Sequence, residues 1–403
     1  MNEMTHKQTL IYSLLLLLLL NYIQLGIGLF EGCDNTYNIV AGTSYVVQSP
    51  YYPGGYPSGT SCRYQFIAPY DYFIQMNCTV NMPENGGSCT TELLYVSTEG
   101  DVQLRGSEQF CGQGTFTRNS LFRRLTIAYA SYGSTGNFRC SLTVLKQNCE
   151  CGWSVTAKIA NGEKVGANEF PFMAALQDKT TNTTFCGASI ISHRYLLTAT
   201  HCKNYQPEAA KITAVVGFNL LSEVNSSRYA ASYSILRFLP YPGYSDEPLT
   251  NDITLVQTAG IIEWSRGVGP ICLPPSASAT FAYNYVDVAG WGTQSFAGPT
   301  SDALMKANLM VIENSVCQQS YDVPIYDSQI CTNDYSGSGR DACQFDSGGP
   351  VILRNSRLFL IGCISYGQPC GLAHGTGVNT RVTSYLSWIR QQTGYTTCVK
   401  PLS

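Results

Sequence analysis

The sequence is poor in charge and has no run of basic residues. Charged residues make up 13% of the 403 residues, and 24 Lys+Arg against 27 Asp+Glu give a net charge of -3. No basic stripe is present that would bind nucleic acid or an acidic membrane surface. The partners of this chain are therefore expected to be proteins.

Long apolar runs are also missing. The run at residues 10–20 follows Lys7 and precedes the small residues Gly26 and Gly28. It falls short of the ~20 apolar residues that cross a bilayer, and no later segment is long enough to span one. The pattern predicts a secretory signal over residues 1–28, cleaved after Gly28, rather than a membrane anchor.

Cysteine, tyrosine and glycine are abundant instead. The 17 cysteines exceed what a reducing compartment tolerates, and 27 tyrosines with 37 glycines suit short strands and tight turns. We expect a secreted, extracellular, mostly β protein of two or three domains. Three sequons, at Asn77, Asn182 and Asn225, could carry glycans. Asn182 and Asn225 lie in polar, turn-like stretches, whereas Asn77 lies in a strand-like run beside a cysteine.

Three short motifs together indicate nucleophilic catalysis. Ser347 lies in DSGGP, His201 in TATHC and Asp252 in NDITLV. A serine needs a base to take its proton, and an imidazole needs a buried carboxylate to hold its tautomer. The three residues occur in the chain order His, Asp, Ser, which is one of several orders in which this triad is found.

With this order the chain resembles the chymotrypsin/trypsin family of serine proteases. The resemblance implies two six-stranded β-barrels over residues 159–393, with a tail at 394–403. Residues 185–191 and 195–199 have the pattern of strands. Four apolar residues at helical spacing predict an amphipathic helix near the end of the domain: Val382, Tyr385, Leu386 and Ile389.

The same resemblance assigns the substrate pocket. Asp341 matches the floor of the pocket in trypsin-like relatives, Gly367 and Gly377 match its walls, and Ser365 matches a substrate-binding position. Glycine walls leave room for a long side chain, and a carboxylate at the floor pairs with Arg or Lys. Cleavage after basic residues is expected.

An activation site is predicted between Lys158 and Ile159. In this family a cut there frees the amine of the new N-terminal residue, which here would fold inward and pair with Asp346. Phe345 stands where relatives usually have glycine. In the family the residue at this position contributes its backbone amide to the oxyanion hole, together with the amide of Ser347. Either the phenyl group turns that amide away, or the amide stays in place and the ring restricts what lies beyond the cleaved bond.

Residues 33–145 alternate short apolar runs with Gly, Pro and Ser clusters, which predicts a β-sandwich. The segment SPYYPGGYP at residues 49–57 and the cysteines around it resemble a CUB domain, a module that binds proteins. Residues 146–158 would then be the linker that ends in the activation site.

The resemblances imply the disulfide bonds. In the CUB domain, whose six cysteines alone allow fifteen pairings, the pairs are Cys33–Cys62, Cys89–Cys111 and Cys78–Cys140. In the rest of the chain they are Cys151–Cys272, Cys186–Cys202, Cys317–Cys331 and Cys343–Cys370. Cys149, Cys363 and Cys398 remain, with Cys363 in an apolar strand and the other two as a leftover pair. Val286 and Leu353 occupy the positions of a pair that many relatives have.

No cofactor or metal is expected. Only Glu92 of the CUB domain falls on a calcium-ligand position of the family, and one carboxylate is too few for a tight site. In the protease domain Phe218 begins the loop where calcium-binding relatives carry a carboxylate.

The sequence thus predicts a secreted, trypsin-like zymogen that resembles the CUB serine proteases of arthropod secretions, venom included. Its expected partners are protein substrates, an activating protease, protein inhibitors and an unidentified CUB ligand. The alternative is a catalytically weak homologue that acts through its CUB domain as a binding or cofactor protein.

Overall fold

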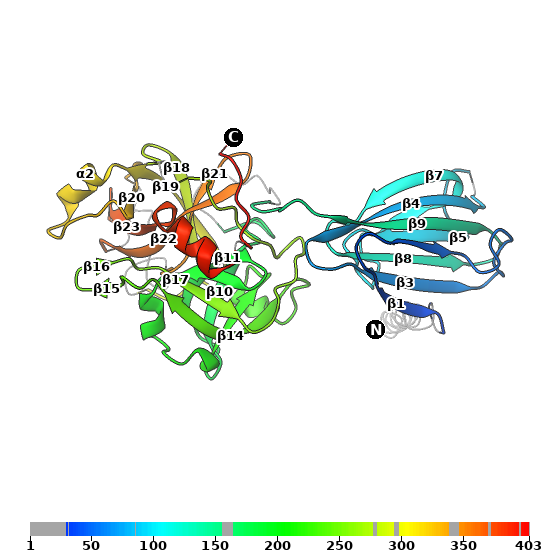
Figure 1. Ribbon diagram of the computed structural model, residues 1–403, viewed down its shortest axis with the longest axis horizontal. Coiled ribbons are helices and arrows are strands. Elements are labelled where there is room, and N and C mark those ends of the chain that lie inside the picture. Colours follow the sequence, from blue (N-terminus) through cyan, green and yellow to red (C-terminus); the bar gives the residue numbers. More distant parts are fainter. Residues whose placement is uncertain are drawn as a thin grey trace, which may run out of the picture. The chain divides into compact units, whose positions relative to one another are not determined.

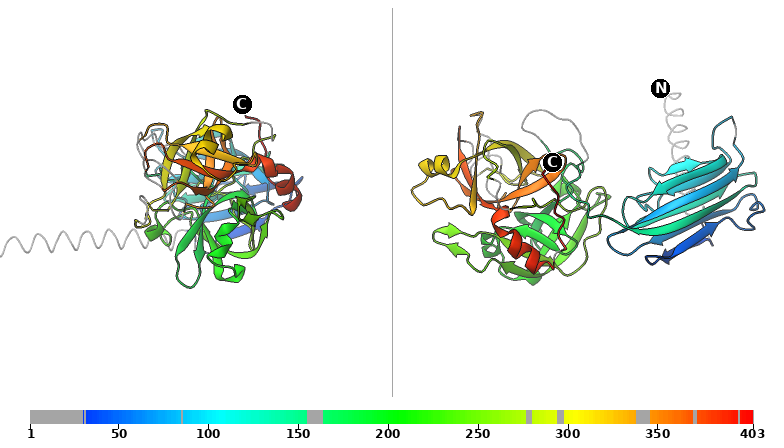
Figure 2. Two further views of the ribbon diagram at one scale, coloured as in Figure 1. Left: turned by 90° about the vertical axis from the view of Figure 1, so that its left-hand side faces the viewer. Right: turned by 45° about the horizontal axis from the view of Figure 1, so that its top comes forward.

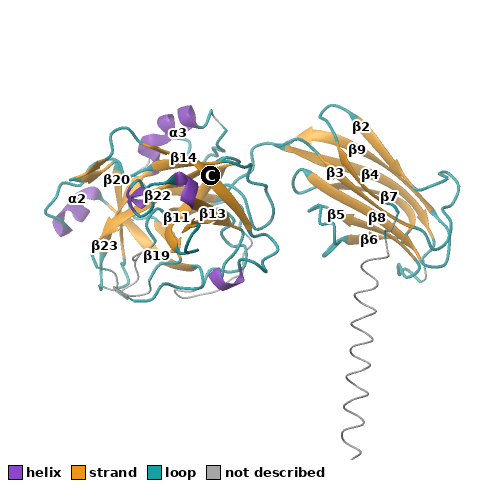
Figure 3. Cartoon of the chain, turned by 90° about the horizontal axis from the view of Figure 1, so that it is seen from below, coloured by secondary structure: helices purple, strands orange, loops and turns teal. Residues whose placement is uncertain are grey.

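The computed structural model describes residues 30–402, except residues 31, 85, 155–163, 277–279, 294–297, 338–345, 370–371 and 395. The chain divides into two compact units, Met1–Asn148 and Cys149–Ser403. Both consist almost entirely of strands joined by loops, with few short helices (Figure 3). The expectation of an all-β protein is confirmed.

The first unit is a sandwich of two sheets, which Figure 1 shows as two layers. One sheet has the strand order β1-β3-β8-β5-β6, built from β1 (Asp34–Asn38), β3 (Ser61–Ile67), β8 (Arg124–Ser131), β5 (Glu92–Ser97) and β6 (Glu108–Phe110). The other has the order β2-β9-β4-β7, built from β2 (Ser44–Gln48), β9 (Asn137–Lys146), β4 (Tyr72–Met82) and β7 (Gly112–Asn119).

The two sheets pack through the buried side chains that alternate with exposed ones along their strands. Along β4, Ile74, Met76, Cys78 and Val80 are buried between the sheets while the residues between them face outward. A period of two is what a strand with one face on a core requires. The core residues of this unit form one apolar cluster.

The second unit contains two closed, six-stranded barrels. The first has the order β10-β11-β12-β17-β14-β13, and comprises β10 (Met173–Asp178), β11 (Thr184–Ser192), β12 (Tyr195–Thr198), β13 (Ile212–Val216), β14 (Ala231–Pro240) and β17 (Thr254–Thr258). The second has the order β18-β19-β20-β23-β22-β21, and comprises β18 (Tyr285–Gly290), β19 (Met305–Ile312), β20 (Gln329–Asn333), β21 (Pro350–Arg354), β22 (Leu358–Gly367) and β23 (Thr376–Arg381).

The predicted helix closes this unit. It begins as the 3-10 turn η5 (Val382–Tyr385) and continues as α3 (Leu386–Gln392), and Figure 2 shows it on the outside of the barrels. The four apolar residues that predicted it are all buried. The short hairpin of β15 (Ser245–Asp246) and β16 (Leu249–Thr250) precedes β17.

Seven disulfides are present among the described residues. They are Cys33–Cys62, Cys78–Cys140, Cys89–Cys111, Cys149–Cys398, Cys151–Cys272, Cys186–Cys202 and Cys317–Cys331. Six are pairs that the resemblances implied, and Cys149–Cys398 joins the two cysteines left over. Cys363 is a buried free thiol, and Cys343 and Cys370 lie outside the described residues.

The segment that follows the first unit is built into the second. Gly152 donates a hydrogen bond to Pro270 O and accepts one from Leu358 N, both within 2.9 Å. Arg357 forms an ion pair with Glu150 at 2.7 Å and donates to Cys151 O. Residues 149–154, which the sequence placed in the linker, therefore pack as part of the barrel unit.

Candidate active site

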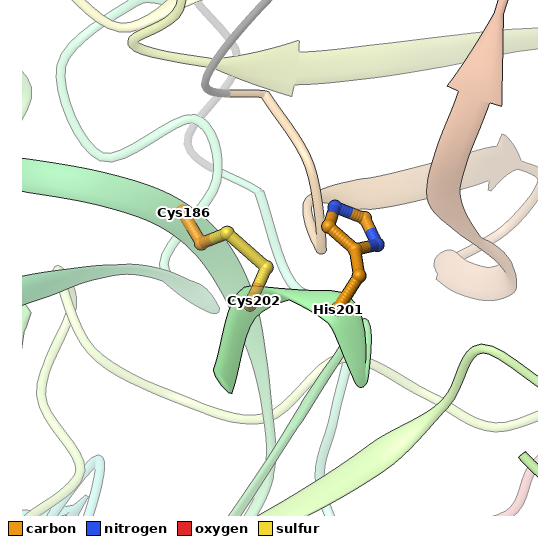
Figure 4. Close-up of side chains that lie close together, drawn as sticks. All are labelled: Cys186, His201 and Cys202. Atoms are coloured by element: carbon orange, nitrogen blue, oxygen red, sulfur yellow. A yellow bond between two sulfur atoms is a disulfide. The ribbon is translucent and has the colours of Figure 1, made fainter. Parts of the chain in front are cut away.

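His201 begins the 3-10 turn η1 (His201–Asn204), three residues after β12 ends. The Cys186–Cys202 disulfide ties this turn to β11 and lies next to the imidazole (Figure 4). Cys186, His201 and Cys202 are the single group within the described part of the chain that is close enough to share a metal ion. Their two sulfurs are bonded to each other and are not thiolates, so this group is no metal site.

Asp252 contacts His201 at both the imidazole ring and the backbone. Its Oδ2 lies 2.7 Å from His201 Nδ1, and its Oδ1 accepts a 2.9 Å hydrogen bond from the His201 backbone N–H. The Asp252 side chain is only 2% exposed, whereas that of His201 is 17% exposed. The carboxylate therefore favours the tautomer with the proton on Nδ1, which leaves Nε2 free to accept a proton.

Two residues of the second barrel complete the environment of Asp252. Ser365 Oγ donates a 2.6 Å hydrogen bond to Asp252 Oδ2, and Thr380 Oγ1 donates one of 2.8 Å to the backbone carbonyl of Asp252. Burial raises the pKa of Asp252, but the hydrogen bonds from His201 and Ser365 lower it below its usual value overall. The sequence had assigned Ser365 to substrate binding and had not singled out Thr380.

Ser347 lies three residues before β21 begins at Pro350 and is partly exposed. Its backbone carbonyl accepts a 2.9 Å hydrogen bond from Gly187 N of β11, so the serine is anchored to the first barrel beside the disulfide. Gly348 follows it with φ +76°, and a Cβ there would lie 2.0 Å from Thr198 Oγ1, so only glycine fits. Within the described residues no hydrogen bond joins Ser347 Oγ to His201, an arrangement common in sites without substrate.

Asp346 lies beside the turn after β18. Its Oδ1 accepts a 2.8 Å hydrogen bond from Gly292 N, and a side chain at Gly290 would collide with that same oxygen. Asp346 therefore has a hydrogen-bond partner in this turn.

Of the expected pocket residues, Gly367 and Gly377 pair directly across β22 and β23. A Cβ at Gly367 would lie 3.2 Å from Gly377 Cα, so a side chain there would press against the backbone of the paired strand. Asp341 and Phe345 lie outside the described residues, as do Lys158 and Ile159 at the expected activation site.

The two positions considered for calcium hold their side chains in other ways. Glu92 is buried and accepts hydrogen bonds from Tyr56 OH, Ser131 Oγ and Ser134 N, at 2.8 to 3.0 Å. Phe218 is buried and stacks on Trp291, with ring centroids 4.8 Å apart. The carboxylate of Glu92 thus already accepts hydrogen bonds from protein donors. The ring of Phe218 offers no ligand to a hard cation, so neither position fits calcium.

Comparison with known families agrees with this architecture. A family described as Trypsin matches residues 159–389, and one described as CUB domain matches residues 33–138. The chain is thus a serine protease of the chymotrypsin-like fold, with a CUB domain on its N-terminal side. It belongs to the trypsin family.

The relatives cover most of the chain. Venom serine protease 34 of Apis mellifera is 34% identical over 376 residues, which is 90% of this chain and 88% of the relative. A venom serine protease of Polistes dominula is 34% identical over 63% of this chain and 92% of its own length. Transmembrane protease serine 11B of Homo sapiens is 35% identical over 62% of this chain and 60% of its own. Within the described residues no helix is long and apolar enough to cross a membrane.

Proposed function

We propose that this chain is the secreted zymogen of an endopeptidase that cleaves proteins after Arg or Lys, with His201, Asp252 and Ser347 as its catalytic residues. The observation that carries the proposal is the line of hydrogen bonds from Ser365 through Asp252 to His201 Nδ1. A buried carboxylate held in this way serves to orient an imidazole and to stabilise its charged form.

In the proposed reaction Ser347 Oγ attacks the carbonyl carbon of the scissile bond while His201 Nε2 takes the hydroxyl proton. Asp252 stabilises the imidazolium, and the backbone amides of Phe345 and Ser347 stabilise the oxyanion. His201 then gives the proton to the leaving amine, and an acyl group remains on Ser347. Water, deprotonated by His201, releases the acyl group by the same route.

Specificity for basic residues follows from the expected floor of the pocket. Asp341 would pair with an Arg or Lys side chain, and the glycines at 367 and 377 leave room for its stem. This is supported by the direct pairing of Gly367 with Gly377 across β22 and β23. A peptide library cut by the active enzyme should be cleaved mainly after Arg and Lys. A majority of cuts after Phe or Leu would rule out this pocket.

Activation would follow a cut between Lys158 and Ile159. The new amine at Ile159 would pair with Asp346 and exchange for the hydrogen bond that Gly292 N donates in the uncut chain. Asp346 directly precedes Ser347, whose backbone amide belongs to the proposed oxyanion hole. An ion pair formed by Asp346 after the cut would therefore move the backbone that forms this hole. The activating protease would itself cut after a lysine.

The expected partners are protein substrates, protein inhibitors and a protein ligand of the CUB domain. Secretion is supported by the signal-like N-terminus, by the seven disulfides and by the relatives named as venom proteases. Glycans are expected at Asn77, Asn182 and Asn225 on the same grounds.

A fluorophosphonate probe tests the catalytic proposal. An enteropeptidase recognition sequence placed directly before Ile159 allows a defined cut, and the cut protein should be labelled on the protease chain far faster than the uncut one. A Ser347→Ala variant, cut in the same way, should not be labelled. If the cut chain that keeps Ser347 is not labelled, the binding or cofactor role of the CUB domain becomes the better account.

A further inference from the structure

Two rows of exposed polar side chains run across the outward face of the sheet, from β7 over β4 to β9. In the first row, Asn77 lies opposite Thr117 of β7 on one side and Ser141 of β9 on the other. In the second row, Thr79 lies opposite Thr115 and Arg139 in the same way. All six side chains are exposed, and Figure 1 shows β7, β4 and β9 side by side in one layer of the CUB unit.

A groove of about 550 Å³ lies over these two rows. The six side chains line it, with Cys78 and Phe116 beneath them. Its volume falls within the range of sites that hold small ligands. Five of the six side chains are neutral hydrogen-bonding groups and the sixth, Arg139, is a cation with five N–H donors. Such a surface suits a neutral ligand that is rich in hydroxyl and acetamide oxygens.

The sequon Asn77-Cys78-Thr79 is part of this groove. Cys78 points to the core, where it is bonded to Cys140, so Asn77 and Thr79 face outward together. Thr117 Oγ1 donates a 2.6 Å hydrogen bond to Asn77 Oδ1. Within the described residues no hydrogen bond uses Asn77 Nδ2, the atom to which an N-linked glycan is attached. The amide is therefore held by its oxygen while its nitrogen is open to the groove.

We propose that Asn77 carries an N-linked glycan whose first sugars lie in this groove, so that the CUB sheet binds the protein's own carbohydrate. Arg139 donates to sugar oxygens, and Thr79, Thr115 and Ser141 exchange hydrogen bonds with hydroxyl and acetamide groups. The inference rests on the proposed secretion of the chain, but not on its catalytic activity.

The attachment is a glycosyl transfer from a lipid diphosphate-linked oligosaccharide. The bond from Asn77 Nδ2 to the sugar C1 forms while the C1–O bond to the diphosphate breaks. The diphosphate leaves with the electron pair, and the amide nitrogen loses one proton to a base of the transferring enzyme. No oxidant or reductant is needed.

The other two sequons provide matched controls within the same chain. Asn182 lies in the turn between β10 and β11 with φ +55°, and Asn225 lies in the turn after η3 (Leu221–Glu223). Both are exposed turn residues, whereas Asn77 lies in a strand between two paired strands. Glycans at the turns should project into solvent. A docked glycan at Asn77 also covers the outward face of β4, so a protein ligand of the CUB domain should bind elsewhere on the domain.

The test uses the full chain with Ser347→Ala, secreted from insect cells. Deglycosylation by peptide N-glycosidase in heavy-oxygen water, followed by peptide mass spectrometry, gives the occupancy of all three sites. We expect Asn77 to be occupied. Under native conditions its glycan should be released at least tenfold more slowly than those at Asn182 and Asn225, and after denaturation all three should be released alike. Arg139→Ala should accelerate release at Asn77 several-fold and leave the other two unchanged.

Two results would overturn the inference. An empty Asn77 beside occupied Asn182 and Asn225 leaves secretion intact and removes the glycan from the groove. Equal release rates at all three sites, unaffected by Arg139→Ala, mean that the glycan does not lie there. Because Arg139→Ala leaves the sequon unchanged, the test does not depend on whether Asn77→Gln folds. An Arg139-dependent binding of free oligosaccharide to chain with an empty Asn77 would instead assign the groove to an external sugar.

Discussion

Ser365 Oγ donates a 2.6 Å hydrogen bond to Asp252 Oδ2, the same oxygen that lies 2.7 Å from His201 Nδ1. Asp252 precedes β17 of the first barrel, whereas Ser365 belongs to β22 of the second. The contact therefore joins the two barrels at the carboxylate on which the imidazole depends. Any loosening between the barrels would act directly on the tautomer of His201.

The first prediction follows from this contact. Ser365→Ala removes one donor from a buried carboxylate, and a hydrogen bond to a charged group contributes about 1.5–3 kcal/mol. If most of this is realised when the imidazolium forms, kcat should fall about tenfold or more while KM changes little. Steady-state kinetics on an arginine ester measures this. Thr380→Val, which removes a donor only to the Asp252 backbone carbonyl, should lower stability and leave kcat within about twofold. An unchanged kcat in Ser365→Ala would show that this contact is structural only.

The sequence predicted the fold, and the contact between His201 and Asp252, from short segments. DSGGP and TATHC are short local motifs that carry the family resemblance, and the two barrels that the resemblance implied are present. The donation from Ser365 to Asp252 is different, since it joins residues 113 positions apart. Its only sequence signal was the position of Ser365 near the pocket. Cys149 and Cys398 have a separation of 249, and they could be paired only as leftovers.

Apolar packing stands at the positions of the cysteine pair that many relatives have. Val286 and Leu353 pair across β18 and β21 and are both buried, as apolar packing requires. The residues next to them add an ion pair between Asp287 and Arg354, and Arg354 also pairs with Glu169. No sequence pattern places Glu169 there, because it comes from a loop before β10.

The second prediction concerns this ion network. Glu169 is 4% exposed, lies 2.7 Å from Lys306 Nζ and accepts a hydrogen bond from Gly166 N at 2.9 Å. Burial raises the pKa of Glu169, but Lys306, Gly166 and Arg354 together lower it below its usual value. Glu169→Gln leaves two cations with one fewer partner. This substitution should lower the free energy of unfolding by about 3 kcal/mol. That is the low end of the values for breaking a buried ion pair, because Arg354 is partly exposed.

The pH dependence gives this prediction its sign. The pKa of Glu169 is lower in the folded protein than its usual value of about 4.5 in the unfolded chain. The ionised side chain therefore stabilises the fold at pH values above 4.5, and this stabilisation is lost as the pH falls through the folded-state pKa. The Tm difference between wild type and Glu169→Gln should thus be constant near pH 7 and shrink below about pH 4. Glu208→Gln is the control, since the Glu208 and Lys211 side chains of that ion pair are 60% and 51% exposed and solvent screens their attraction, so its Tm should stay close to that of wild type. A difference that grows toward acid pH would contradict this account.

The third prediction concerns what remains joined after activation. Cys151–Cys272 and Cys149–Cys398 both cross the cut expected after Lys158. Replacing either pair with serine should leave cut protein as one band on a non-reducing gel, and replacing both pairs should give two bands. A wild-type chain that separates without reductant would contradict both bridges. Keeping two bridges means that partial reduction does not release the CUB domain from the protease.

The last prediction concerns Phe345, whose residue type departs from the family at the oxyanion hole. A hole that had lost one amide donor would cost ~3 kcal/mol of transition-state stabilisation, roughly a hundredfold or more in rate. We expect the amide to be in place, since the other residues of the proposed catalytic site have their expected types, and the ring to lie on the leaving-group side. Phe345→Gly should then change hydrolysis of small arginine esters by less than about threefold and tighten binding of large, rigid protein inhibitors at least tenfold.

Phe345→Ala is the matched control for this experiment, because it removes the ring without adding the backbone freedom of glycine. If the ring acts by obstruction, alanine should tighten inhibitor binding nearly as much as glycine does. If the backbone is at fault, glycine alone should raise ester hydrolysis, by about a hundredfold, and alanine should not. That second result would mean that the uncomplexed enzyme has a misplaced amide and needs a partner or a substrate to set its oxyanion hole.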